Sequence, residues 1–369
     1  MKILLIGEYS NVHATLAKGL RELGHQVTVF SNGDFWKDYQ RDIDLVRIPG
    51  KIGGVRYMLK LITILPRLRG YDVVQLINPM FLELKAERIL PIYKWLRRHN
   101  CKMLMGAFGM DYYWVHECTT RKPLRYSDFN FGDKLRDDEV ALRDVRDWEG
   151  TTKGKLNQYI ANDCDGIISG LYEYDVCYRP NFPDKTTFIP YPVEVASPQP
   201  SPKGEGAESE RPLRFFIGIS KSRHKYKGTD IMLAALERLK ADYPDKVEIV
   251  KAEGVPFSEY QEMLDGSDVL LDQLYSYTPA MNGLLALSKG IVLVGGGEEE
   301  NYEILGENEL RPIVNVLPDE EDVYQRLKAL IMNPEDVARR KSDSIEYIRR
   351  HHDYIKVAKQ YEKIYELSN

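Results

Sequence analysis

Short apolar runs alternate with amphipathic helical stretches along almost the whole chain, and this alternation constrains the fold more than any other feature of the sequence. The chain opens with an apolar run at Lys2–Gly7, continues with a helical pattern at Val12–Leu23, stops at Gly24-His25 and resumes with a second apolar run at Gln26–Phe30. This is a β-α-β beginning. Buried parallel strands joined by crossover helices produce such a pattern, so the sequence predicts an α/β fold.

The alternation falls into two blocks, each long enough for a parallel sheet of its own. In the first block, further strands are predicted at Val73–Leu76, Lys102–Met105, Gly166–Ser169 and Thr187–Pro190. In the second block, strands are predicted at Arg214–Ile219, Val247–Lys251, Val269–Leu271 and Ile291–Val294, and helices at Asp230–Lys240, Phe257–Leu264 and Met281–Lys289. Two further helical stretches, Glu321–Met332 and Glu335–Glu366, close the chain.

A polar stretch between the blocks marks the expected domain boundary. Residues 196–211 contain almost no apolar side chain and several prolines and glycines, which is typical of a linker. We therefore expect Rossmann-like domains over 1–195 and 212–349, with their parallel sheets facing a central cleft. The last helix, about 350–369, is expected to pack back on the first domain. A chain of 369 residues is long enough for two such domains.

Composition argues against several other classes of protein. No stretch approaches the roughly 20 apolar residues that span a bilayer, and the first residues lack the pattern of a signal peptide, so we expect a cytoplasmic protein. A net charge of -5 gives no overall attraction to nucleic acid. The four cysteines lack the paired spacing of a zinc site, and reduced thiols are expected.

The most informative motif is a basic loop between a predicted strand and a predicted helix. Residues 220–230 read Ser-Lys-Ser-Arg-His-Lys-Tyr-Lys-Gly-Thr-Asp. Ligands bind at the carboxyl ends of parallel strands, so this loop lies where a ligand is expected. Lysine and arginine there can neutralise a departing nucleoside diphosphate, and N–H groups at the start of the helix can donate to its oxygens. The alternative is a solvated charged turn.

The segment from Phe216 to Gly228 resembles the pattern of glycosyltransferase family 4, in which a strand and an Arg or Lys precede Lys-Gly and a helix. The likeness continues through 255–257, 264–273 and 285–294. It implies a GT-B fold and a nucleoside-diphosphate sugar as substrate, with no cofactor and no metal. It also implies that Lys227 and either Arg223 or Lys221 are the cations that bind the donor phosphates. Further candidate contacts of the donor are Gly7, Ser220, Gly228, Val255 and Pro256.

Two glutamates of the family pattern are replaced in this chain. Their places, eight residues apart, fall on Tyr277 and Leu285. In the family the first is thought to contact the donor sugar and the second the ribose. Thr278 and Asn282 can supply neutral hydrogen bonds to a sugar instead, and tyrosines of the same loop, Tyr277 among them, can stack on its apolar face. The alternative is a degenerate, inactive site.

A glycine-rich turn follows the last predicted strand. Gly295-Gly296-Gly297 and the acidic residues after it, up to Glu303, resemble the glycine turn of the family and the glutamate that follows it. Glycines permit close approach of the backbone to a ligand. Three successive carboxylates at 298–300 argue against a phosphate at this turn, so Glu303 is a candidate for binding a sugar or ribose hydroxyl. Helix capping is the alternative.

In the first block, the loop after the strand Lys102–Met105 ends in Gly109-Met110-Asp111 and resembles the Gly-x-Asp loop of the family. The family often has a histidine at the place of Phe108. Asp111 is therefore the best carboxylate for contacting the acceptor hydroxyl or the transferred sugar. The alternative role is an ordinary helix N-cap, a position that aspartate strongly prefers.

Two Asp-x-Asp pairs, at Asp42 and Asp44 and at Asp163 and Asp165, are not expected to bind metal. Each precedes a predicted strand and lies away from the expected ligand end, and aspartates are common in solvated turns.

Two other segments bear on the acceptor. Tyr112–Gly154 is aromatic and charged and is expected as an insertion near Asp111, either binding sugar faces or packing on a small core of its own. The stretch 51–69 is basic and amphipathic. It is either an interfacial helix that contacts the inner membrane surface or an ordinary surface helix.

The sequence predicts a hexosyltransferase-like enzyme. It transfers a sugar from a nucleoside-diphosphate sugar to a glycan or lipid-linked saccharide, as expected in bacterial polysaccharide or glycoconjugate biosynthesis, and retention of configuration is implied by the resemblance. Two alternatives stay open: a nucleotide-sugar epimerase of the same fold, and a non-catalytic nucleotide-sugar-binding regulatory subunit. The first loop lacks the spaced glycines of a dinucleotide site, which makes a nicotinamide enzyme remote.

Overall fold

The structure is a computed structural model that describes residues 1–195, 211–220 and 223–367, and of Trp36 only the backbone. Its contacts divide the chain into two compact units. The first unit comprises 1–123, 143–192 and the chain from Tyr354 onwards, and the second comprises Leu124–Leu142 and Val193–Asp353. The expected linker, 196–211, lies outside the described residues except for Arg211.

The first unit contains a seven-stranded parallel sheet in the order β3-β2-β1-β4-β5-β8-β9. Its strands are β1 (Lys2–Ile6), β2 (Gln26–Ser31), β3 (Ile43–Asp44), β4 (Val73–Leu76), β5 (Lys102–Ala107), β8 (Gly166–Ser169) and β9 (Thr186–Phe188). Its helices are α1 (Val12–Glu22), α2 (Gly50–Ile64), α3 (Ala86–His99), α4 (Tyr112–Thr119), α6 (Thr152–Asp163), α7 (Tyr172–Tyr178) and α15 (Tyr354–Glu366), with 3-10 turns η1 (Phe35–Lys37) and η2 (Leu65–Arg67).

The apolar sequence of β1 follows from the position of this strand inside the sheet. Ile3, Leu4, Leu5 and Ile6 are fully buried, because β1 lies between two parallel strands and is covered on both faces. Burying each such side chain contributes about 1.5–3 kcal/mol. The strand predicted at Thr187–Pro190 corresponds to β9, but β9 begins at Thr186 and ends at Phe188.

The second unit contains a five-stranded parallel sheet in the order β11-β10-β12-β13-β14. Its strands are β10 (Leu213–Ile219), β11 (Val247–Glu253), β12 (Val269–Leu271), β13 (Val292–Gly295) and β14 (Val314–Asn315). Its helices are α8 (His224–Lys227), α9 (Thr229–Asp242), α10 (Phe257–Asp265), α11 (Met281–Ser288), α12 (Glu299–Leu305), α13 (Glu320–Met332) and α14 (Pro334–Tyr347). The core contains Phe215 and Ile217 of β10, Leu271 of β12 and Leu236 of α9.

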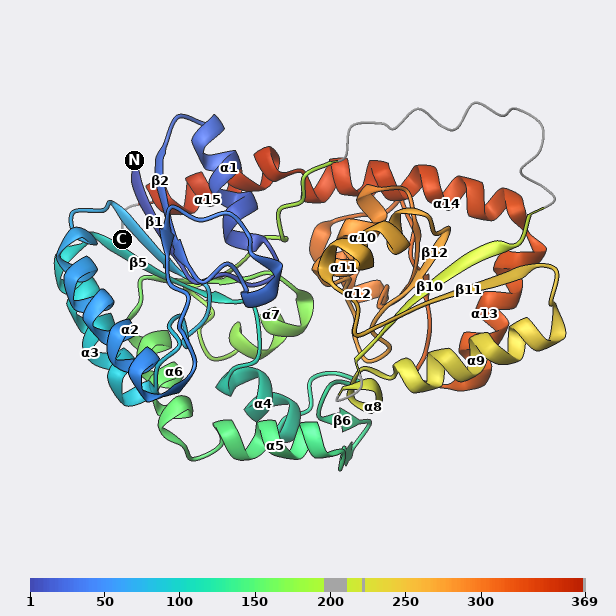
Figure 1. Cartoon of the computed structure of the whole chain (residues 1–369), viewed down its shortest axis with the longest axis horizontal. Helices are drawn as coiled ribbons and strands as arrows, with labels where there is room; N and C mark the ends of the chain where they lie inside the picture. Colours follow the sequence, from blue (N-terminus) through green and yellow to red (C-terminus); the bar gives the residue numbers. More distant parts are fainter. Residues whose placement is uncertain (196–210, 221–222, 368–369) are drawn as a thin grey trace. The chain divides into compact units, whose positions relative to one another are not determined.

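A segment from the first half of the sequence is grouped with the second unit, although the sequence assigned all of 1–195 to the first domain. We call Leu124–Asp138 the arm. It contains the two-stranded antiparallel hairpin β6 (Asn130–Phe131) and β7 (Lys134–Leu135), followed by α5 (Glu139–Trp148). Figure 1 shows the hairpin at the label β6.

The chain end differs from the single helical stretch predicted at Glu335–Glu366. α14 ends at Tyr347, a π-helical turn, η3, follows at Ile348–His352, and α15 begins at Tyr354. The reason lies in the backbone: the carbonyl of His352 accepts from the N–H of Val193 (2.7 Å) and Asp353 leaves helical geometry. The carbonyl is thus engaged outside the helix.

The last helix packs against the first one. Figure 1 shows α15 in red beside α1 in blue. The two helices can lie this close because residue 19 of α1 is a glycine and has no side chain. A Cβ on Gly19 would stand 2.6 Å from the carbonyl oxygen of Tyr354. α15 is further tied to the first unit because the hydroxyl of Tyr365 donates to Gln75 (2.7 Å).

Candidate functional site

The basic loop after β10 has a defined geometry around its Lys-Gly pair. Gly228 ends α8 and begins α9 with a φ of 72°, and a Cβ there would stand 2.6 Å from Leu274. Glycine is therefore required by both the left-handed conformation and the contact. The carbonyl of Lys227 accepts from the N–H of Leu274 (3.0 Å), which ties this loop to the loop after β12.

The predicted cations surround this turn. Arg223 precedes α8 with an exposed side chain, Lys227 ends it half-buried, and Ser220 accepts from the N–H of Arg223 (3.0 Å). Lys221 lies outside the described residues. The first N–H groups of α9 follow directly and have no partners within their own helix, as at any helix start. Cationic side chains next to such N–H groups have the chemistry that suits an anion.

A half-buried carboxylate that the sequence did not single out, that of Asp272, lies near Lys227. Burial raises the pKa of Asp272, and the charge of Lys227 opposes this rise. Asn282 donates to Asp272 (3.4 Å) and accepts from the hydroxyl of Tyr260 (3.2 Å). The predicted Asn282 is therefore placed near the predicted Lys227 through Asp272. The available signal was the position of Asp272, directly after a buried strand.

Two of the predicted residues in the loop after β12 have buried side chains. Tyr277 is 1% exposed and Thr278 is 3% exposed. The hydroxyl of Tyr277 accepts from the N–H of Arg125 (2.7 Å), and its ring lies 4.8 Å from the Arg125 guanidinium and 5.0 Å from the Tyr126 ring. Stacking of Tyr277 on a sugar, expected from the sequence, is not supported, because the arm covers this ring.

The turn after β13 carries three carboxylates at the carboxyl end of the sheet, where the basic loop also lies. Arginines pair with all three. Arg125 binds Glu298 and Glu300, and Arg311 donates to Glu299 (2.8 Å). The glycines pack closely, since a Cβ on Gly296 would stand 2.4 Å from the carbonyl oxygen of Ser276. We call Gly295–Glu300 the acidic turn. Glu303 lies farther along α12 with an exposed side chain.

The remaining predicted contacts of the second unit lie at the edge of its sheet. Val255 and Pro256 follow β11, the neighbour of β10, and Pro256 begins α10. Val255 is half-buried and Pro256 is exposed. The structure therefore places the predicted residues of this unit in the loops that follow β10, β11, β12 and β13 and in the helices that begin after those loops.

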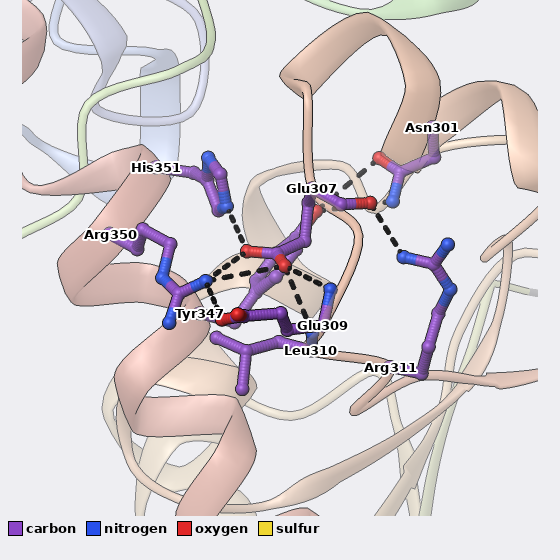
Figure 2. A network of polar contacts seen from close by, with 8 residues as sticks. All are labelled: Asn301, Glu307, Glu309, Leu310, Arg311, Tyr347, Arg350 and His351. Carbon is purple, nitrogen blue, oxygen red and sulfur yellow. Dashed lines mark hydrogen bonds and ion pairs between the residues drawn. The ribbon is translucent and has the colours of Figure 1, made fainter.

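A polar network fixes the helix that follows the acidic turn. Figure 2 shows the carboxylate of Glu307 between His351 and Arg350, which contact Oε2, while the backbone N–H groups of Glu309 and Leu310 donate to Oε1. Burial alone would raise the pKa of Glu307, but these bonds outweigh it and lower the pKa to about 2. Asn301 of α12 also contacts Tyr347 of α14 (3.1 Å).

In the first unit, Gly7 follows β1 with a φ of 86°, and its carbonyl accepts from His13 (2.8 Å). The carboxylate of Glu8 accepts from the N–H groups of His13 (3.2 Å) and Ala14 (2.8 Å). Burial raises the pKa of Glu8 to about 8, although these bonds oppose it. The start of α1 is thus occupied by a carboxylate of the protein itself, which leaves no place for a phosphate on these two N–H groups.

Asp111 is the N-cap of α4. Its carboxylate is fully buried and accepts from the N–H of Trp114 (2.9 Å) and from the hydroxyl of Tyr178 (2.7 Å). Burial raises its pKa to about 7, and both bonds oppose the rise. The loop before it is aromatic, since the ring of Phe108 lies 5.4 Å from that of Tyr191.

The Asp-x-Asp pairs are engaged with arginines. Asp165 accepts two bonds from Arg97 (2.7 and 2.6 Å), and Asp42 accepts from Arg21 (2.6 Å). Within 1–195, 211–220 and 223–367 no group of three or more His, Cys, Asp or Glu side chains is placed to hold a metal ion. In the same ranges, no helix has the length and apolar character needed to cross a membrane.

The fold of this chain is similar to that of known structures over their whole length. No family model and no curated protein matches the sequence. HepE of Anabaena, solved with UDP and glucose, superposes with a TM-score of 0.62 at 11% identity, covering 100% of both chains. Sucrose-phosphate synthase of Thermosynechococcus elongatus gives 0.60 at 11% identity, covering 99% of this chain and 98% of that one.

WaaG, a glycosyltransferase involved in lipopolysaccharide biosynthesis, gives a TM-score of 0.53 at 10% identity, covering 100% of both chains. This chain has the GT-B fold. A UDP-GlcNAc 2-epimerase of Neisseria meningitidis, bound to UDP-GlcNAc, is also similar, with a TM-score of 0.54 at 11% identity and 99% of both chains covered. The GT-B likeness therefore includes proteins that use nucleotide sugars in different reactions.

Proposed function

We propose that the chain is a glycosyltransferase that moves a sugar from a nucleoside-diphosphate sugar to a glycan or lipid-linked saccharide, as in the assembly of a polysaccharide or glycoconjugate. The observation that carries this proposal is the basic loop of 220–228. It joins Lys227, Arg223 and the start of α9 at the carboxyl end of β10, in a GT-B fold. The resemblance to glycosyltransferase family 4 supports the same assignment.

In this proposal Lys227 and Arg223 bind the two phosphates of the donor, with Lys221 as a further cation. As the bond between the anomeric carbon and the phosphate oxygen breaks, negative charge grows on that oxygen, and cations fixed nearby stabilise it. The acceptor oxygen forms the new bond, and its proton passes to the departing phosphate. Such a reaction retains configuration and needs neither a metal nor a separate base.

In this proposal an amide, a carboxylate and backbone groups recognise the sugar and the nucleoside. Asn282 and Glu303 are proposed to bind hydroxyls, since Tyr277 and Leu285 stand where the family has glutamates. Val255 and Pro256 are proposed to contact the base, and Gly228 allows close approach of the diphosphate. Thr278 is proposed to act through its backbone, because its side chain is buried.

The acceptor side is assigned to the first unit, where Asp111 follows β5. Asp111 is fully buried and caps α4 through the N–H of Trp114, so in this proposal it holds the loop of 106–111 in place for the acceptor and does not itself contact the acceptor hydroxyl.

A further part of the proposal concerns α2 and a membrane surface. Ile52, Val55, Leu59 and Ile62 are 75, 60, 58 and 61% exposed. Their spacing of three, four and three residues places them on one face of the helix. Between Asp44 and Asp72 the sequence contains six Lys and Arg residues and no Asp or Glu. An apolar face flanked by cations suits the surface of an anionic membrane, where a lipid-linked acceptor would lie.

The proposal is tested by a donor screen without added metal. Purified protein is given UDP-, GDP-, ADP- and TDP-sugars together with glycan or lipid acceptors, and the released nucleoside diphosphate is measured. UDP-sugars come first, because similar GT-B structures contain UDP or UDP-sugars. Release of one nucleoside diphosphate with a glycosylated product supports transfer.

Two alternatives give different results in the same screen. An epimerase converts UDP-GlcNAc into its epimer and releases no sugar to an acceptor; the similarity to UDP-GlcNAc 2-epimerases favours testing it. A regulatory subunit binds a donor and does not convert it. The replacement of the two family glutamates favours this alternative. Lack of binding to every donor rejects all three.

A further inference from the structure

The arm is a rigid segment that contacts the loops after β10, β12 and β13. Asn130, which is fully buried, donates to the carbonyls of Leu124 (2.9 Å) and Gly132 (3.0 Å), and Phe129 is 1% exposed. Ser127 and Asn130 close the turn between them, with the N–H of Ser127 on the carbonyl of Asn130 (2.8 Å). The arm therefore holds its own shape and can present side chains in fixed positions.

Arg136 connects the arm to the basic loop. Its guanidinium donates to the carbonyl of Lys225 (2.9 Å) in α8 and lies 3.9 Å from the centroid of the Tyr275 ring. Its other donors are directed within the arm, to Ser127 and Asp138. Only 10% of the Arg136 side chain is exposed. One residue thus fixes α8 against the loop after β12.

Arg125 connects the arm to the acidic turn. Its guanidinium binds Glu298 (2.9 Å) and also Glu300, and the hydroxyl of Tyr126 donates to the other oxygen of Glu298. Its backbone N–H donates to Tyr277, as described above. The side chain of Arg125 is 56% exposed, so it carries its charge at the surface of this edge.

The charges of the acidic turn matter for an anionic ligand. Only β12 separates β10 from β13, and neighbouring strands lie about 4.8 Å apart, so the ends of β10 and β13 are about 10 Å apart. Uncompensated carboxylates on the acidic turn would repel a diphosphate held on the basic loop across that distance. Arg125 pairs with two of the three carboxylates and offsets one of their two negative charges, and Arg311 pairs with the third.

We propose that the arm is a working part of the donor site. In it, Arg136 positions the basic loop through Lys225 and Tyr275, and Arg125 offsets part of the negative charge of the acidic turn, so that a nucleoside diphosphate can bind along this edge of the sheet. This inference rests on the proposed function, since it assumes that the edge binds a donor. Both arginines are positioning residues, because they act through other groups.

Arg125 is half exposed, but its partners are largely covered: 11% of the Glu298 side chain and 21% of the Glu300 side chain are exposed. Loss of Arg125 therefore alters the field at the edge and also leaves two carboxylates without their arginine, so the thermal midpoint of each variant is measured and binding is compared below it. Double substitution tests the field directly, because neutralising Glu300 removes part of the charge that Arg125 offsets.

The experiment is a calorimetric titration of the wild type and of variants with UDP, GDP, ADP and TDP and with the corresponding nucleosides. We expect Arg125→Met to weaken binding of the preferred diphosphate about tenfold and that of its nucleoside less than twofold. Arg125→Met combined with Glu300→Gln should recover most of the loss. Arg136→Met should give a similar diphosphate-specific loss, and Arg136→Lys a smaller one. Lys134→Met, at an exposed position of β7 in the same arm, is the control and should bind as the wild type does.

Equal losses for diphosphate and nucleoside, no loss, or no recovery with Glu300→Gln would overturn the role of the arm. If the wild type binds a diphosphate and the Arg125 and Arg136 variants bind it equally well, this inference fails alone. If the wild type binds no nucleoside diphosphate, the proposed function fails and this inference fails with it.

Discussion

The carboxylate of Glu307 lies 2.6 Å from Nε2 of His351, although 44 residues separate them in the sequence. Glu307 follows α12 and His351 belongs to η3, the π-helical turn before the chain enters α15. The same carboxylate accepts from Arg350 and from two backbone N–H groups, so it is buried without loss of hydrogen bonds (Figure 2). This contact therefore holds the second unit together where its last helices end.

Glu307→Gln should destabilise the protein by about 2 kcal/mol at pH 7, because it removes the charged partner of Arg350 and His351. The pKa of Glu307 in the folded chain is lowered to about 2 from its usual 4.5. Its contribution is therefore present above about pH 4.5 and is lost as the pH falls towards 2. Urea unfolding of both proteins between pH 3 and 7 measures this. A difference that grows as the pH falls would contradict the assignment.

Lys227→Ala should lower donor turnover about 10²–10³-fold, because a cation fixed at the departing phosphate acts mainly in the transition state. The thermal midpoint should change little, since the residue ends the short helix α8. Lys225→Ala, at an exposed position of the same helix, is the matched control and should keep most of the turnover. Equal losses in the two variants would indicate a general effect of positive charge and not a specific contact.

Asp111→Asn should separate donor binding from transfer. Asparagine caps a helix as well as aspartate does, so α4 and the fold should persist. The carboxylate that accepts from the hydroxyl of Tyr178 is lost, so the loop of 106–111 is held less firmly, and we expect kcat/KM for the acceptor to fall at least tenfold while the affinity for the donor is unchanged. Steady-state kinetics with each substrate varied in turn measures both. Weaker donor binding with unchanged acceptor kinetics would argue against the assigned role.

Leu59→Gln combined with Ile52→Gln should weaken binding to anionic vesicles of phosphatidylglycerol, because two exposed apolar side chains of α2 are replaced. Binding of the wild type should fall as salt rises and should be weak on phosphatidylcholine. Leu317→Gln, at an apolar position of the second unit that is 48% exposed, is the control. Vesicle sedimentation provides the measurement. Equal binding by the wild type and the double variant would reject the membrane-facing role of α2.

Much of the fold was predictable from local pattern. Val73–Leu76, Gly166–Ser169 and Val269–Leu271 match β4, β8 and β12 residue for residue, because buried parallel strands are short continuous apolar runs. The π-helical turn at 348–352 was not predictable, since it depends on Val193, more than 150 residues earlier in the chain. The β6–β7 hairpin has strands of two residues each, too short for a periodic signal.

Part of the candidate site was likewise predictable from the sequence and part was not. The Lys227-Gly228 turn was predictable because its residue types follow from local chemistry and backbone geometry. The cover over Tyr277 was not, because it comes from Arg125 and Tyr126, which lie about 150 residues away in sequence. The only signal in the sequence was the aromatic and charged character of 112–154. That character predicted an insertion but not its partner.

The central claim is that the loops after β10, β11, β12 and β13 bind a nucleotide sugar. Photolabelling with 5-azido-UDP-glucose, followed by peptide mapping, tests it most directly, with excess UDP as the competitor. We predict labelled peptides from the second unit, within 211–230 or 251–282, and loss of the label when UDP is added. Label confined to 1–123, or label that UDP does not remove, would contradict the account.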